Sequence, residues 1–393
     1  MLDAKERKQN KIAGIELFLV ACLSLLPTGG IYEYIKLAGV AVILVELLIR
    51  GALKLNNSLL TIIFIITFAS SVALVFSVFS KSTDNSELMH ELKRNGFLCG
   101  LIILSSNLKV DFKSIYRVCV FFILINTLIQ VLEYMKVEAV FDFIETYYVT
   151  SGEESIHLEL ARYEGFLYFR AGSIFLNPNV YMVIPLVSMS VFLQHSILGR
   201  SWFNKLMIVV TCLSIFLTGS RTAVVITFAL LIVYALCLQN RPALKVTFVA
   251  VALLILAAIS KLADTYRIFD VSSGLDNSLG TKLTLLLEYF NVAGPISLIF
   301  GSLGIGNIGQ IDFELGYIFA FYGILGVVWF ALIVRSIKYE SSVYTFITRA
   351  LRIVLILMAC TASVLLCMPI CTFFLSIALA KPTVNVKAKA DAV

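Results

Sequence analysis

Long apolar segments alternate with short polar connections along nearly the whole chain. The segments cover approximately residues 12–27, 35–49, 59–79, 89–106, 114–135, 180–199, 203–219, 221–238, 243–260 and 313–335, and an apolar stretch follows over 353–380. A helix of about 17–25 residues crosses the hydrocarbon core of a membrane. Pro369 interrupts the last stretch, which has room for one tilted span with a short return helix or for two tight spans. The pattern predicts eleven or twelve membrane-spanning helices in a single domain over residues 1–393.

Composition and the N-terminal sequence both favour an all-α polytopic integral membrane protein. Residues of the AVILMFWYC set make up 60% of the chain and charged residues only 14%, too few charges for the surface of a water-soluble domain of this length. The first apolar segment follows a basic head, as in a signal peptide. Because no small-residue cleavage motif follows and further spans come at once, we interpret it as an uncleaved first span.

The distribution of basic residues predicts the side of the membrane that each connection faces. Apart from the N-terminal head, the alternate short connections that are rich in Lys and Arg hold Arg50, Lys54, Lys109, Lys113, Arg117, Arg200, Lys205, Arg241, Lys245, Arg335, Lys338, Arg349 and Arg352. Short cytoplasmic loops carry an excess of such residues, so the N-terminus is predicted to be cytoplasmic. The basic C-terminal end favours twelve crossings. Two long polar segments, 136–179 and 261–312, then lie on the outer face.

Two arginines at the ends of apolar segments are the main candidates for a binding site. Arg170 lies in FRAGSIFLNPN and Arg221 in LTGSRTA, and both are predicted to face outward. Because a cation inside a bilayer is costly, such an arginine either snorkels to the surface or faces a wet cavity with an anionic ligand. The tight hairpin favours a ligand role for Arg221, whereas both interpretations stay open for Arg170. If both segments open on one side, the two guanidinium groups could hold one phosphate group between them.

The first long loop, 136–179, interleaves aromatic and aliphatic residues with acids at helical intervals. This pattern predicts short amphipathic helices that lie along the membrane. The aromatic residues near its end, Tyr168 among them, either stack on sugars or form an interfacial belt. The loop ends in Asn177-Pro178-Asn179, which fits a helix cap as well as a ligand role.

The second long loop, 261–312, is polar in its first half, where Arg267 lies, and rich in glycine in its second half. The glycines resemble a phosphate-binding loop only loosely, because no Lys-Ser/Thr pair follows them. Asp312 and Glu314 stand where the chain enters the next apolar segment. Either carboxylate is a candidate for a general base, and either could instead cap the N-terminus of the following helix.

Metal and disulfide chemistry have little support in the sequence. All eight cysteines fall in apolar segments, where they are interpreted as small apolar side chains. The three histidines are scattered, and no cysteine or carboxylate lies near them at metal-ligand spacing. We therefore expect neither a metal site nor a cofactor.

Taken together, these features resemble the family of bacterial O-antigen polymerases and ligases. The resemblance covers roughly Tyr163 to Gly326. It rests on basic inner connections between many spans and on a long outer loop that ends in Arg170-Ala-Gly-Ser and Asn177-Pro178-Asn179. It also rests on the TGSRTA hairpin and on a second outer loop that leaves through FGSLGIGNIGQIDFELGY into FYGILG.

The resemblance implies a GT-C-type glycosyltransferase of the bacterial inner membrane that acts on its periplasmic face. Its substrate would be an oligosaccharide on undecaprenyl diphosphate, with Arg170 and Arg221 contacting the diphosphate and stabilising its charge as it leaves. The surrounding candidates for substrate binding are Asn177, Asn179, Ser220, Tyr168, Glu314, Arg162 and Arg267. The arginine-x10-glycine pattern of some polymerases is not reproduced, because serine follows both Arg162 and Arg267 at that spacing. Further expected partners are membrane lipids, a chain-length regulator and a flippase. No nucleic-acid partner is expected.

Within this family the sequence favours the polymerase branch. Ligases usually carry a histidine just before the span that follows the second outer loop, whereas Asp312 stands at the equivalent place here and no histidine follows His195. A ligase that transfers glycan to lipid A-core remains an alternative. Another is a transporter or flippase with a basic cavity for lipid diphosphates. Transporters usually contain internal repeats and broken helices, and the two halves of this chain show no convincing repeat.

Overall fold

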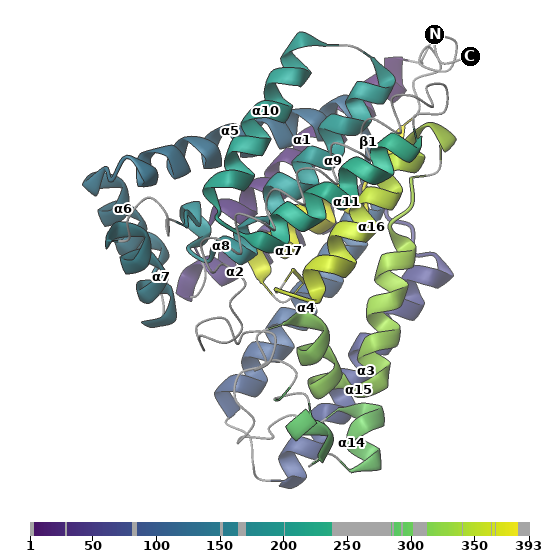
Figure 1. Ribbon diagram of the computed structural model, residues 1–393. Coiled ribbons are helices and arrows are strands. Elements are labelled where there is room, and N and C mark those ends of the chain that lie inside the picture. Colours follow the sequence, from purple (N-terminus) through teal and green to yellow (C-terminus); the bar gives the residue numbers. More distant parts are fainter. Residues whose placement is uncertain are drawn as a thin grey trace.

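The computed structural model describes residues 4–27, 30–80, 85–149, 152–163, 170–199, 201–237, 284, 287–291, 294–301, 313–339, 341–362, 364–365 and 367–383. These residues form a helical bundle with two three-residue strands (Figure 1). The longer helices are α1 (Ala4–Cys22), α2 (Gly30–Ile49), α3 (Asn57–Ser80), α4 (Asn85–Asn107), α5 (Phe112–Tyr134), α6 (Glu138–Tyr148), α7 (Gly152–Tyr163), α9 (Val183–Leu198), α10 (Trp202–Leu217), α11 (Arg221–Cys237), α15 (Glu314–Ser336), α16 (Thr345–Ala359) and α17 (Met368–Ala378). The shorter elements are η1 (Leu23–Leu25), η2 (Ser173–Phe175), α8 (Pro178–Tyr181), α14 (Pro295–Phe300), η4 (Ser342–Tyr344), β1 (Lys109–Asp111) and β2 (Lys381–Thr383).

Among the described residues, four helical segments are long and apolar enough to cross a membrane, namely Phe112–Tyr134, Pro178–Leu198, Glu314–Ser336 and Ser342–Ala359. Shorter apolar helices cover Asn57–Val72, Trp202–Leu217, Thr222–Cys237 and Met368–Ala378. The all-helical prediction is therefore confirmed, and so is the presence of helices that could span a membrane. The full count of eleven or twelve spans stays a prediction, and the segment expected at 243–260 lies outside the described residues.

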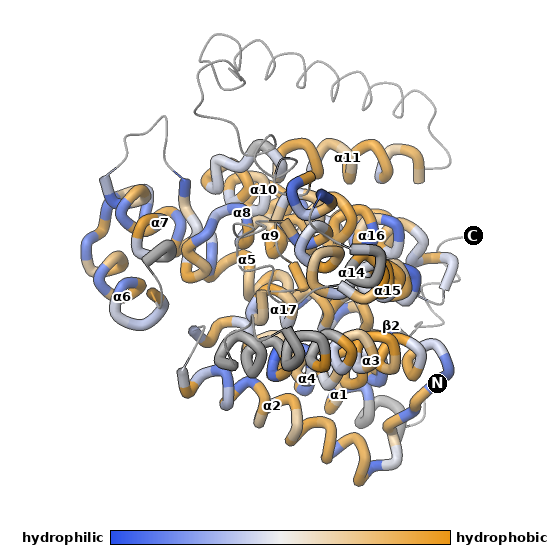
Figure 2. Tube along the Cα trace, turned by 90° about the horizontal axis from the view of Figure 1, so that it is seen from below, coloured by the Kyte–Doolittle hydropathy of each residue, from blue (hydrophilic) through white to orange (hydrophobic). Residues whose placement is uncertain are grey.

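The outer surface of the bundle is apolar over much of its area. Figure 2 shows hydrophobic residues along α2 and α11, which lie on opposite sides of the view. On α2, Val42 and Leu48 are 66% and 64% exposed, while Val40 and Leu47 on the other face are buried. A helix that is apolar on both its buried and its exposed faces suits a hydrocarbon surrounding better than water. This arrangement supports a membrane location.

The apolar C-terminal stretch forms two helices. α16 ends at Ala359, and α17 begins at Met368 with Pro369 in its first turn, a position where the missing N–H of proline costs nothing. Pro369 therefore starts a helix here instead of interrupting one. All eleven residues of α17 are buried, and the helix packs against α1, α4, α9 and η1. After it, β2 pairs in parallel with β1, which places the end of α17 beside the start of α5.

The short helices expected in the first long loop are present as α6 and α7. α6 buries Phe141 and Ile144 against Leu158 and Ala161 of α7, and it exposes Tyr147. Each helix thus buries apolar residues against the other, and each also exposes large apolar side chains, such as Phe143 on α6 and Ile156 on α7. Most of the second long loop, including 261–283 and 302–312, lies outside the described residues.

Candidate functional site

Three chain segments meet around the side chain of Asn179. Its Oδ1 atom accepts a hydrogen bond from Nη2 of Arg170 at 2.7 Å and another from Oγ of Ser220 at 3.4 Å. The backbone N–H of Ala171 donates to the carbonyl of Leu217 at 2.9 Å, which fixes the segment before η2 against the end of α10. We call Arg170, Asn179 and Ser220 the Arg170 cluster. The structure thus brings together three residues that the sequence analysis selected.

The turn between α10 and α11 determines how Ser220 and Arg221 enter this cluster. Gly219 has a φ of +58°, a left-handed conformation that suits glycine and lets α11 begin two residues later. Oγ of Ser220 accepts from the backbone N–H of Ala223 at 3.4 Å, in the manner of a helix N-cap. Arg221 is the first helical residue, and its side chain lies outside the described part of the chain.

Asn177 and Asn179 have different roles in the structure. Asn177 caps α8, because its Oδ1 accepts from the backbone N–H of Asn179 at 2.9 Å and Pro178 occupies the first turn. The predicted helix cap is therefore confirmed for Asn177. The side chain of Asn179 instead faces the exposed guanidinium of Arg170. Together with the positive end of α11, this guanidinium forms a surface that suits an anion.

A buried polar network supports the Arg170 cluster from beneath. Nε2 of Gln130 donates to the carbonyl of Ala171 at 3.3 Å, and Oγ of Ser214 donates to Oε1 of Gln130 at 2.7 Å. The hydroxyl groups of Tyr181 and Ser214 share a hydrogen bond of 2.8 Å. All three of these side chains are buried, so α5, α8 and α10 are joined by satisfied polar contacts directly below the cluster.

The tight turn at η2 is held by the same helix α5. The carboxylate of Glu133 accepts from the backbone N–H of Ser173 at 3.1 Å, and Oγ of Ser173 donates to Oδ1 of Asn126 at 2.8 Å. A Cβ atom at Gly172 would lie 2.1 Å from the carbonyl oxygen of Leu176, so only glycine fits there. These contacts fix the backbone that follows Arg170.

This supporting network was not predicted from the sequence, although a signal for it was present. Asn126, Gln130 and Glu133 lie four and three residues apart, so they share one face of α5. A polar stripe on an otherwise apolar candidate span is costly unless it has buried partners or a function. The stripe could have been found from this spacing, but its partners at Ala171, Ser173 and Ser214 could not.

Arg162 is engaged elsewhere. Its guanidinium pairs with Glu138, Asp142 and Glu145 of α6 at 3.1, 3.0 and 3.2 Å, and it lies over the ring of Phe141 at 5.4 Å. These contacts hold α7 on α6. None of the described contacts of Arg162 reaches the Arg170 cluster.

Glu314 is fully buried at the start of α15. Its carboxylate accepts the backbone N–H groups of Val364, at 3.1 Å, and Leu365. Both donors belong to the irregular segment between α16 and α17, so Glu314 satisfies backbone groups that the two helices leave unpaired. Tyr168, Arg267 and Asp312, the other residues expected at the site, lie outside the described residues.

A second arginine cluster lies inside the bundle and was missed by the sequence analysis. Arg94 of α4 is 5% exposed; its Nη2 donates to the hydroxyl of Tyr322 at 3.3 Å, and its guanidinium lies 5.1 Å from the ring centre of Tyr317. Nδ2 of Asn95 donates to the same hydroxyl at 2.7 Å and to Oγ of Ser70 at 2.9 Å. We call this group the Arg94 cluster. The signal was an Arg-Asn pair within the predicted span 89–106.

The backbone of α15 is broken beside the Arg94 cluster. Gly323 follows Tyr322 and has φ +60° and ψ −151°, which is not helical. A Cβ atom there would lie 2.5 Å from the carbonyl carbon of Ile299, and one at Gly301 would lie 2.0 Å from the carbonyl oxygen of Phe321. The backbone at Gly301 therefore touches the backbone of the FYGILG motif at Phe321 and Gly323.

The fold defines an all-helical protein, and the part of the chain that the structure describes contains four helices able to cross a membrane. Comparisons of the chain with protein-family models, curated proteins and solved structures find no match. Within the described ranges, no three or more His, Cys, Asp or Glu side chains are grouped so that they could hold a metal ion. The resemblance to O-antigen polymerases and ligases therefore stays a prediction from the sequence.

Proposed function

We propose that this protein is a membrane glycosyltransferase that polymerises O-antigen or a related surface polysaccharide. The observation that carries the proposal is the Arg170 cluster, in which Asn179 joins Arg170 to Ser220 at the first turn of α11. Arg221 directly follows Ser220, so the backbones of both arginines belong to one site. Two guanidinium groups and the positive end of a helix are suited to the diphosphate of a lipid-linked oligosaccharide.

In the proposed reaction, a hydroxyl group of a new lipid-linked repeat unit attacks the anomeric carbon of the growing glycan. The bond from that carbon to undecaprenyl diphosphate breaks, and the arginines stabilise the negative charge on the departing diphosphate. A general base takes the proton of the attacking hydroxyl. Asp312 is preferred for this role over Glu314, because the carboxylate of Glu314 is already bound to backbone N–H groups.

The proposed topology has eleven or twelve crossings of the bacterial inner membrane, with a cytoplasmic N-terminus and the Arg170 cluster on the periplasmic side. The four long apolar helices and the shorter ones support such a multi-pass arrangement. The eleven residues of α17 extend only about 16 Å, roughly half of the hydrocarbon core. α16 is therefore assigned to a crossing span and α17 to the short return helix that follows it.

The test uses a deletion strain that is complemented with variants of the two arginines. Arg170→Ala, Arg221→Ala and Arg221→Lys are each expected to shorten the polysaccharide ladder severely, since lysine lacks the bidentate geometry of arginine. Arg117→Ala, which removes an exposed arginine near the start of α5, is the matched control and should leave the ladder unchanged. Normal long chains from all three test variants, at wild-type protein levels, would refute the proposal.

A lipid-linked oligosaccharide transporter is the second candidate, and broken helices favour it. α15 is interrupted at Gly323, and the described residues between α16 and α17 are not helical. Discontinuous helices of this kind form substrate sites in many transporters. The deletion strain separates the candidates, because loss of a polymerase leaves core sugar with one repeat unit, whereas loss of a flippase or a ligase leaves none. Transfer of glycan to lipid A-core by purified protein would identify a ligase directly.

A further inference from the structure

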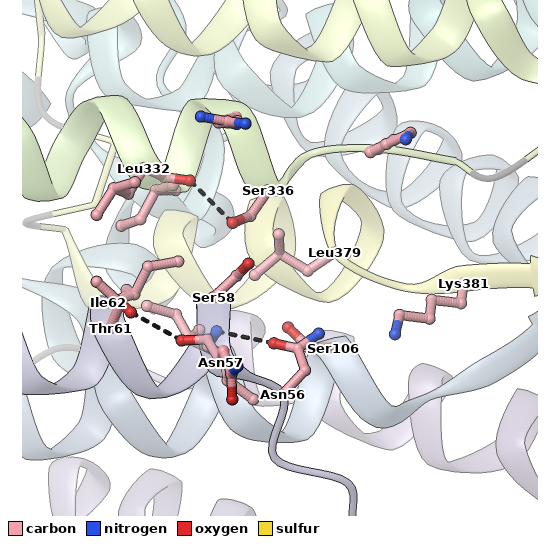
Figure 3. A pocket seen from close by; sticks show the side chains of 15 residues that line it. Asn56, Asn57, Ser58, Thr61, Ile62, Ser106, Leu332, Ser336, Leu379 and Lys381 are labelled. Atoms are coloured by element: carbon pink, nitrogen blue, oxygen red, sulfur yellow. Dashed lines mark hydrogen bonds between the residues drawn. The ribbon is translucent and has the colours of Figure 1, made fainter.

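A cavity of about 530 Å³ lies where α3 begins, where α4 and α15 end, and beside the first residue of β2 (Figure 3). We call it the basic cavity. Its lining residues come from the start of α3, from the end of α4, from the end of α15 and the segment after it, and from Leu379 and Lys381. None of these residues belongs to the Arg170 cluster or the Arg94 cluster, so the cavity is a separate feature of the molecule.

The charged part of the wall has one sign. Arg335 comes from the last turn of α15, Lys338 from the segment after it, and Lys381 from β2. The backbone N–H of Lys381 donates to the carbonyl of Leu108 at 2.9 Å, which fixes this lysine at the cavity wall. No carboxylate is among the described residues of the wall. Three cations without an acid in the same wall attract an anion.

The uncharged part of the wall has two kinds of surface. Hydroxyl and amide groups come from the first turns of α3, from Ser106 and from Ser336. Ser106 and Ser336 lie across the cavity from one another in Figure 3. Apolar side chains complete the wall, and of these Ile333 and Leu379 are buried in the bundle. A ligand that fits this wall carries an anionic group, polar groups that accept or donate hydrogen bonds, and an apolar part.

The position of the cavity suggests the source of such a ligand. α15 is one of the four helices long enough to cross a membrane, and Arg335 and Ser336 are at its end. The cavity would therefore lie at the depth of lipid headgroups. Basic pockets between the ends of membrane helices are suited to anionic headgroups.

We propose that the basic cavity binds the phosphate headgroup of an anionic phospholipid. Arg335, Lys338 and Lys381 surround the phosphate, the hydroxyl and amide groups bind the glycerol part, and the acyl chains begin along Leu332 and Leu379. This site is independent of the proposed glycan chemistry, because no residue is shared with the Arg170 cluster.

The experiment uses the full-length protein, delipidated in a neutral maltoside detergent. Native mass spectrometry would measure binding of dioctanoyl phosphatidylglycerol, with dioctanoyl phosphatidylcholine and inorganic phosphate as separate probes. Lys381→Gln and Arg335→Gln are each expected to weaken phosphatidylglycerol binding about fivefold, and the double variant about 25-fold. Phosphatidylcholine should bind much more weakly than phosphatidylglycerol to the wild-type protein.

Two further variants separate the site from general charge and from misfolding. Lys109→Gln removes an exposed lysine that is paired in register with Lys381 but does not line the cavity, and it should change binding less than twofold. Ser58→Trp keeps all three cations and fills the cavity, and it should abolish binding while the protein remains monodisperse. Equal losses from Lys109→Gln and Lys381→Gln, or unchanged binding to Ser58→Trp, would overturn the proposal. If inorganic phosphate saturates the site and phosphatidylglycerol binds no better, the cavity binds a free phosphate compound, and the proposal of a lipid ligand is overturned.

Discussion

The Arg170 cluster and the Arg94 cluster both centre on an arginine beside tyrosine or amide side chains, but they differ in exposure. Arg170 is exposed and lies at the junction of three chain segments, whereas Arg94 is 5% exposed and lies between α4 and the broken helix α15. An exposed cation is accessible to a ligand from solvent. A buried cation must be satisfied by the protein itself, so its removal acts first on stability.

The two arginines also differ in the residues that lie beneath them. The backbone beside Arg170 is fixed by Gln130, Glu133 and Asn126, which are buried polar residues on one face of α5. Around Arg94, the polar contacts and the close approach of two backbones are parts of the same core. Changes in the Arg94 region should therefore destabilise the fold. Changes in the Arg170 region should instead reduce activity with little loss of stability.

Gly323→Ala should produce the largest loss of stability. The new Cβ would lie only 2.5 Å from the carbonyl carbon of Ile299, so the two atoms would clash. The backbone angles at this position, φ +60° and ψ −151°, also form a conformation that alanine avoids. We expect a loss of about 4 kcal/mol in the free energy of unfolding. Thermal unfolding of purified protein in detergent would measure it. The matched control is Gly96→Ala, where no atom lies within 4 Å of the added Cβ and stability should not fall.

Arg94→Ala should cause the next largest loss, about 3 kcal/mol, because it removes a buried charged donor to Tyr322 and its packing on Tyr317. Tyr322→Phe, which keeps the ring and removes the hydroxyl, should cost less. The same unfolding assay would rank the two variants. If the Arg94→Ala protein is stable but makes no polysaccharide ladder, Arg94 acts in substrate binding and not in stabilising the core.

Gln130→Leu should have a smaller effect, about 1–2 kcal/mol, because it leaves Ser214 and the carbonyl of Ala171 without their buried partner. Since Ala171 adjoins Arg170, polysaccharide chains should also shorten. Leu128→Ala, on an exposed face of the same helix, is the control for helix α5 and should leave chain length unchanged. Unaltered chains from Gln130→Leu would show that the network does not position Arg170.

Arg170→Ala should have the smallest effect on stability, below about 0.5 kcal/mol, and the proposed function requires it to abolish long chains. Asn179→Ala keeps both arginines and removes the acceptor between Arg170 and Ser220, so chains of intermediate length are expected. Ladder length at equal protein levels and the unfolding temperature would be measured together. A large fall in the unfolding temperature of Arg170→Ala would mean that Arg170, like Arg94, stabilises the fold.

Part of the fold and of the site follows from local sequence pattern. The segments predicted at 114–135 and 313–335 correspond to α5 and α15, since apolar runs of this length form helices wherever they are buried or in lipid. Asn177 and Pro178 predict their own helix cap, because a cap involves only neighbouring residues. The pattern left open a short return helix after Pro369, which corresponds to α17, but it did not predict the break at Gly323, because that break depends on contacts with distant segments.

The sequence by itself determined that the protein is helical, that its outer surface is apolar, and that arginines stand at the ends of apolar segments. These properties depend on composition and on spacing within one helix. Tertiary structure alone decided the partners: Arg162 joined three carboxylates of α6, Glu314 bound the backbone after α16, and Arg94 met Tyr322 across 228 residues of sequence. A buried polar group takes the partner that packing brings within hydrogen-bond distance, and no local pattern contains that information.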